Sequence, residues 1–152
     1  MSRPPDPTLD RGFCLAYGVG LALCVAWPLA LQALLGTLIP PHPQPAGEVV
    51  RELGYTFTGL TLASAAFVLW RWGRVRRSFG ALDRRRRVRV LAREILVYSV
   101  LFEASSLFGL LYFALGGPQA ERYARGFLAL TPVMFLVFVP RLRAWREAAR
   151  EE

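Results

Sequence analysis

The sequence has few of the residues that most often carry catalysis or bind metals. It holds one histidine and two cysteines in 152 residues. Cys14 and Cys24 lie in one apolar run, about 15 Å apart along a helix, so we expect no disulfide between them. A single His42 cannot build a zinc site or a bis-histidine haem site within one chain. We therefore expect no bound metal and no cofactor.

The side-chain sets that activate a nucleophile are also missing. The serines have no histidine near them that would act as a base, and Cys24 lies deep in an apolar run. The chain contains no glycine-rich phosphate loop. We therefore predict that the protein is not an enzyme.

Charge is nearly absent from four long stretches, although 20% of the residues are charged and 54% are hydrophobic. A helix needs about 20 largely apolar residues to cross the hydrocarbon core of a membrane. Together with their flanks, the stretches predict spans at residues 12–39, 53–72, 95–115 and 123–139. The predicted fold is an all-α integral membrane protein, with residues 1–152 forming a single domain of four transmembrane helices.

Lysine is absent, and all nineteen basic residues are arginines. Ten of them lie in residues 71–94, where only Asp83 and Glu94 oppose them, giving this segment a net charge of +8. The loop at residues 40–53, which includes a proline-rich run, has a net charge of −1. Short arginine-rich loops remain on the cytoplasmic side. The pattern predicts a multi-pass protein of the inner (cytoplasmic) membrane, with both termini in the cytoplasm.

The second and third spans are predicted to form one long hairpin. Gly80 suits the position after a helix end, and Asp83 suits the N-cap of the next helix. The arginine-rich stem, residues 71–94, would then project about 10–15 Å into the cytoplasm. We expect Trp72 and Phe79 to anchor the hairpin at the lipid headgroups.

The arginines of this stem are the predicted binding surface for lipids or a partner protein. They are Arg74, Arg76, Arg77, Arg84, Arg85, Arg86, Arg87 and Arg89. Basic residues beside a membrane attract anionic lipids, by about 1 kcal/mol each. No aromatic stacking platform accompanies the arginines, so we expect no nucleic-acid partner.

Small residues recur every four positions early in the first span, at Gly12, Ala16 and Gly20. Such a ridge lets two helices approach closely in a membrane. The spacing predicts a packing surface, either within the bundle or between two chains.

Glu103 is the only ionisable acid or base in the middle of a predicted span. A charge at that depth costs at least a few kcal/mol, about 2.5–3.5 kcal/mol on insertion scales. No cation lies at a matching depth in the sequence, so we expect a neutral carboxylic acid. Two roles remain open: Glu103 either hydrogen-bonds a neighbouring helix or carries an ion.

Residues 103–110 read Glu-Ala-Ser-Ser-Leu-Phe-Gly-Leu. This segment resembles the ion-carrying helix of the rotary ATPase proteolipid, subunit c, which typically reads Glu-Ala, two residues, an aliphatic, an aromatic, Gly and Leu. In that family the acid lies mid-membrane on the second helix of a hairpin with a cytoplasmic loop. The resemblance implies that Glu103 binds a proton or a sodium ion, with Ser106 as a hydrogen-bond partner. Residues 54–70 lack the dense glycine repeat of that family.

The sequence favours a non-catalytic small membrane subunit that assembles with itself or with a larger membrane complex. Its arginine-rich stem would dock anionic lipids or a partner. One alternative is proteolipid-like translocation of a proton or sodium ion by Glu103. Another is a scaffold or regulator that depends on anionic lipids.

Overall fold

The computed structural model describes residues 7–35, 37 and 47–150 of the chain, and all regular structure within them is helical. The elements are α1 (Pro7–Leu34), α2 (Gly47–Phe79), α3 (Arg84–Gly116), the 3₁₀ turn η1 (Gly117–Ala120), α4 (Glu121–Phe138) and α5 (Leu142–Ala148). The predicted all-α fold is confirmed. The predicted spans fall on α1 to α4, whereas the proline-rich run with His42 and the end of the first span lie outside the described residues.

Three stretches of the described chain are long and apolar enough to cross a membrane. They are Pro7–Leu34, Gly47–Phe79 and Arg84–Ala148, the last of which runs from α3 to α5. These helices fit a membrane protein. Many large apolar side chains on their outer faces are exposed, as lipid-facing residues are in such proteins.

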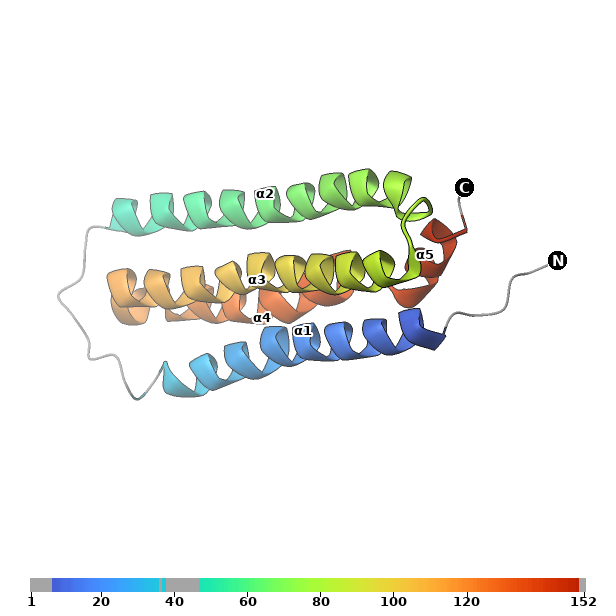
Figure 1. Cartoon of the computed structure of the whole chain (residues 1–152). Helices are drawn as coiled ribbons and strands as arrows, with labels where there is room; N and C mark the ends of the chain where they lie inside the picture. Colours follow the sequence, from blue (N-terminus) through green and yellow to red (C-terminus); the bar gives the residue numbers. More distant parts are fainter. Residues whose placement is uncertain (1–6, 36, 38–46, 151–152) are drawn as a thin grey trace.

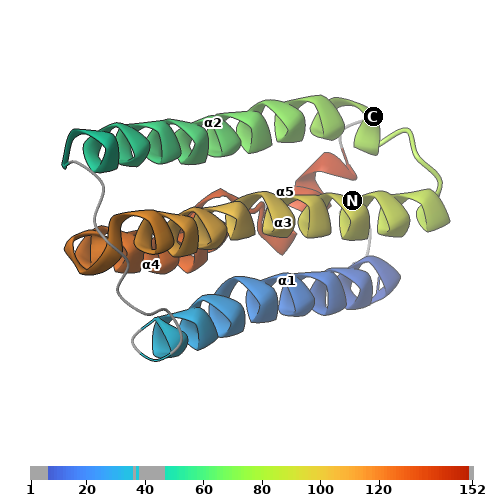
Figure 2. The same ribbon diagram turned by 90° about the vertical axis from the view of Figure 1, so that its left-hand side faces the viewer.

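The α3–α4 pair forms the centre of the molecule, with α1 and α2 on opposite sides of it (Figures 1 and 2). α3 packs against each of the other three long helices. The start of α1, the α2–α3 turn and α5 all lie at one end, which we call the arginine end. The start of α2 and η1 lie at the other, which we call the η1 end.

The predicted hairpin is present. α2 ends at Phe79 and α3 begins at Arg84. Asp83 caps α3, because its Oδ1 atom accepts a hydrogen bond of 2.8 Å from the backbone N–H of Arg86. The side chain of Arg87 donates to the carbonyl oxygen of Gly80 and closes the turn.

α2 begins at Gly47, so part of the predicted loop at residues 40–53 is helical. Glu48 stands in the first turn of α2, where an acidic side chain is favoured by the helix dipole. α2 is therefore longer at the η1 end than the hydropathy pattern predicts.

The ridge of small residues on α1 packs against α3 within the chain. A Cβ atom on Gly12 would lie 2.7 Å from Cγ1 of Val88, and one on Gly20 would clash with Oγ of Ser99. Ala16, between them, is buried. The structure therefore uses this ridge inside the bundle.

An aromatic cluster, formed by Trp72, Phe79 and Trp145, closes the arginine end. The Trp145 ring centroid lies 4.6 Å from that of Trp72 and 4.9 Å from that of Phe79. Phe79 and Trp145 are fully buried. The prediction that Phe79 anchors the hairpin at the headgroups is therefore wrong, because α5 covers its ring.

α5 is fastened to the start of α1 by an ion pair. Both oxygens of Asp10 accept hydrogen bonds from the guanidinium of Arg146, at 3.1 and 2.6 Å. The tail after α4 is thus part of the packed structure, which the sequence analysis did not predict.

Candidate functional sites

Both carboxyl oxygens of Glu103, on α3, are buried and make no hydrogen bond of normal geometry among the described residues, although the Ser106 side chain lies near enough to interact with the carboxyl group. One turn before Glu103, the carbonyl oxygen of Ser99 accepts a weak hydrogen bond from Sγ of Cys24 at 3.5 Å.

α1 contains a proline one turn after Cys24, which interrupts its backbone hydrogen bonding. Pro28 lies inside α1 and is buried. A proline has no N–H, so the helix supplies no donor to the carbonyl oxygen of Cys24, four residues earlier.

Ser106, the expected partner of Glu103, takes part in the contact between α3 and α4. Its Oγ atom lies 2.8 Å from Oγ1 of Thr131, and both side chains are fully buried. Ser105 donates to the carbonyl oxygen of Phe127 at 3.2 Å. The hydroxyls of residues 103–110 therefore bond to α4.

Gly109 brings the backbones of α3 and α4 together. A Cβ atom at this position would lie 2.8 Å from the carbonyl oxygen of Ala124 and 3.1 Å from Cβ of Phe127. Ser105, Ser106 and Gly109 thus have a packing role within the chain. Glu103 is the member of the proteolipid-like segment that this packing leaves unexplained.

Arg71 of α2 and Glu94 of α3 form a bidentate ion pair at the base of the stem. Nε and Nη2 of Arg71 donate to the two carboxylate oxygens of Glu94 at 2.5 and 2.8 Å. The Glu94 side chain is 4% exposed and that of Arg71 is 25% exposed. This pair was not predicted from the sequence. The sequence feature that could have indicated this ion pair is an arginine and an acid at similar distances before and after the predicted turn.

The stem presents an exposed cationic surface at the arginine end. Of the eight predicted binding arginines, the exposed ones are Arg74, Arg76, Arg77, Arg84, Arg85, Arg86 and Arg89. Arg87 is partly buried. The two acids of the stem are already engaged, since Asp83 caps α3 and Glu94 binds Arg71.

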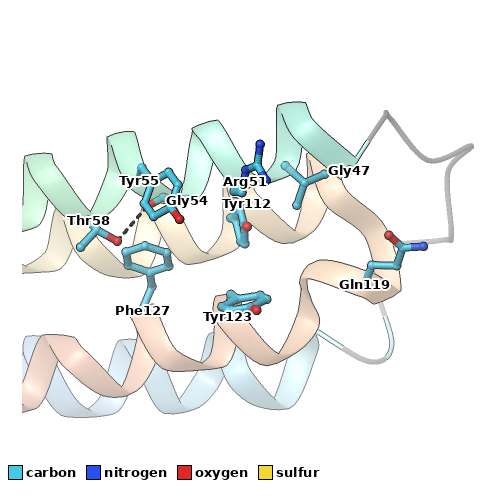
Figure 3. Close-up of a pocket in the computed structure, with 10 residues that line it drawn as sticks. Gly47, Arg51, Gly54, Tyr55, Thr58, Tyr112, Gln119, Tyr123 and Phe127 are labelled. Carbon is cyan, nitrogen blue, oxygen red and sulfur yellow. Dashed lines mark hydrogen bonds between the residues drawn. The ribbon is translucent and has the colours of Figure 1, made fainter.

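A second site lies at the η1 end, where α2, α3, η1 and α4 line a half-open pocket of about 450 Å³. Figure 3 shows side chains of α2 on one wall and of α4 on the other. The polar side chains at its rim are Arg51 and Gln119, and the interior is largely aromatic. This pocket was not predicted from the sequence, because its residues come from α2, α3, η1 and α4, which only the fold brings together.

Comparison with protein-family models, with curated proteins and with solved structures found no match to the chain. No cluster of three or more metal-ligating side chains occurs in the part of the chain that the structure describes. The observations thus define the protein by class, as an all-helical protein with helices able to cross a membrane.

Proposed function

We propose that the protein is a multi-pass protein of the inner (cytoplasmic) membrane with four spanning helices. The charge pattern supports this arrangement, since the ten arginines of residues 71–94 favour a cytoplasmic arginine end. α1 begins and α5 ends at that same end, which would put both termini in the cytoplasm. α4, with 18 residues, would be the fourth span.

Within the membrane, the protein would act as a non-catalytic subunit that assembles with copies of itself or with a larger complex. The arginine-rich stem would be its docking surface for anionic lipid headgroups or for an acidic partner. The observation that carries this proposal is the stem surface itself, on which seven of the predicted binding arginines are exposed. Like charges gathered on one surface call for an anionic partner.

Replacing Arg84–Arg87 with alanine should weaken binding of phosphatidylglycerol by tenfold or more, since each lost charge removes about 1 kcal/mol of attraction. The measurement is a lipid titration of the purified protein in mild detergent, with Arg122→Ala and Arg125→Ala, at the η1 end, as the control. Unchanged lipid binding would contradict the docking role of the stem.

The same preparations test assembly. The wild-type chain should co-purify as an oligomer or with a partner, and a lone monomer at all concentrations would contradict the subunit proposal. If the stem variant loses lipid but keeps its assembly, the protein is better described as a scaffold or regulator that depends on anionic lipids.

The second candidate function is proteolipid-like translocation of a proton or sodium ion. It is favoured by one observation, the buried carboxyl oxygens of Glu103 without a hydrogen bond of normal geometry in the described chain. An intramembrane acid of this kind is a functional candidate by default. Any ion it carried would need a cation on another chain to trigger release, because the sequence places no basic residue in the middle of a predicted span.

Glu103→Gln should abolish ion flux in reconstituted vesicles under this second candidate, while the helical content remains unchanged. Carbodiimide should label Glu103 in the wild type, and labelling should fade as pH rises, because the reagent attacks the protonated acid. Glu52→Gln, which removes an exposed acid of α2, is the control. Flux that persists in Glu103→Gln would exclude translocation by this residue.

A further inference from the structure

We propose that the pocket at the η1 end binds one anionic lipid, with its charged headgroup at Arg51 and its acyl chain against the aromatic wall. This inference rests on the proposed membrane placement, in which the η1 end lies at the outer headgroup level. It concerns a site at the opposite end from the stem.

The electrostatics of the pocket favour an anion. Arg51 is the one charged side chain among the described residues that line it. Its nearest acid is a weak partner, since Oε1 of Glu48 lies 4.0 Å from Nη2 of Arg51 and both side chains are more than half exposed. A phosphate can therefore replace Glu48 at the guanidinium, which binds phosphate oxygens in a bidentate manner.

The first turn of α2 also favours an anion in the pocket. Gly47, the first residue of α2, and Val50 both line the pocket. Backbone N–H groups in the first turn of a helix have no partner inside the helix, and the helix dipole favours negative charge there. The headgroup region of the pocket therefore combines a guanidinium with a helix N-terminus.

The interior of the pocket suits an acyl chain. Tyr112 is only 3% exposed, and its ring packs edge-on against those of Tyr123 and Phe127, with centroids 6.2 and 6.1 Å apart. Phe57 supports this wall through an edge contact with Tyr112 at 6.3 Å. Because the rings hold one another in place, the apolar wall exists before a ligand arrives.

Gly54 lines the pocket where α2 approaches the Tyr112 ring closely. A Cβ atom at this position would lie 3.0 Å from the hydroxyl oxygen of Tyr112. From Arg51 to Thr58, α2 follows the pocket for about 10 Å, a depth that accommodates the upper part of an acyl chain. The Thr58 hydroxyl does not present an unpaired donor to the acyl chain, because it donates a hydrogen bond to the carbonyl oxygen of Gly54 at 2.8 Å.

A lipid is the occupant favoured by the position and size of the pocket. Tyr55 and Tyr123 line it and are 72% and 63% exposed, as tyrosines at the membrane–water interface are. The pocket, about 450 Å³ in volume, is half open, so a molecule from its surroundings can enter it. Lipid is the molecule available there.

The test is native mass spectrometry of the full chain in mild detergent, titrated with phosphatidylglycerol or with zwitterionic phosphatidylcholine. The wild type should retain one tightly bound phosphatidylglycerol and should bind phosphatidylcholine at least tenfold more weakly. The Arg84–Arg87→Ala variant should retain the same tightly bound phosphatidylglycerol. Arg51→Gln should weaken the tight site about tenfold, the scale of one charge-assisted hydrogen bond.

Two glycines of α2 provide a matched pair. Gly54→Leu fills the pocket and should remove the bound lipid, whereas Gly59→Leu should retain it, because nothing lies within 4 Å of a Cβ atom at Gly59. If Gly54→Leu does not fold, Arg51→Gln still tests the lipid site. The Arg51 side chain is 64% exposed, so we expect this variant to fold. Equal lipid retention in Arg51→Gln and wild type, or equal binding of both lipids, would overturn the proposal.

Two further outcomes distinguish a failure of the pocket site from a failure of the proposed docking role of the stem. Tight binding of soluble dodecanoate without phosphatidylglycerol would overturn the lipid assignment. Loss of the tight lipid in Arg84–Arg87→Ala alone would place the lipid on the stem and overturn the pocket site, while leaving the docking role of the stem intact.

Discussion

The Arg71→Ala variant is expected to lose about 3–5 kcal/mol of unfolding free energy, the range found when one partner of a buried ion pair is removed. The carboxylate of Glu94 would be left without its bidentate partner, and its side chain is 4% exposed. The measurement is thermal or denaturant unfolding in mild detergent, followed by circular dichroism.

Arg93→Ala is the matched control. Arg93 also lies near Glu94, with its Nε atom 4.0 Å from Oε1, but its side chain is 69% exposed. Exposed pairs of this kind contribute about 0–1 kcal/mol. Equal losses in the two variants would contradict the structural role of Arg71, and a double variant, Arg71→Ala with Glu94→Gln, should recover part of the loss because no buried charge remains.

A second large effect is expected from Gly109→Ala, which should lower the unfolding free energy by about 1–3 kcal/mol through overpacking. The added methyl group would lie 2.8 Å from the carbonyl oxygen of Ala124, and backbone cannot move aside as a flexible side chain does. The helices would separate and weaken the hydroxyl contact between Ser106 and Thr131.

Gly126→Ala, on α4, is the control for this change. Nothing lies within 4 Å of a Cβ atom at Gly126. Alanine has a higher helix propensity than glycine, so we expect this variant to be as stable as the wild type or more stable. If Gly109→Ala unfolds at the same temperature as Gly126→Ala, α3 and α4 do not approach as closely as the structure describes.

Much of the fold follows from hydropathy and turn chemistry alone. Long uncharged runs predict the helices, and the Gly80–Asp83 turn predicts where the hairpin bends. The η1 end and α5 were harder to predict. Glu48 at a helix start is a weak signal beside a proline-rich run, and the seven residues of α5 are too few for a clear period.

The candidate sites were less accessible to prediction. A lone acid such as Glu103 is visible, because charge stands out in an apolar run. The partners of Ser106 and Arg71 depend on which helix faces which, and hydropathy does not carry that information. The pocket is harder still, since Arg51, Tyr112 and Phe127 come from three helices and share no motif.

The place of α1 has a consequence for how the protein is made. α1 packs against α3 and α4, while α2, the next helix to be synthesised, lies on the far side of that pair. Gly20 meets Ser99, which leaves the ribosome on the order of ten seconds later at 5–20 residues per second. Until then α1 has no native neighbour, so its insertion has to depend on its own hydrophobicity and its docking on the arrival of α3.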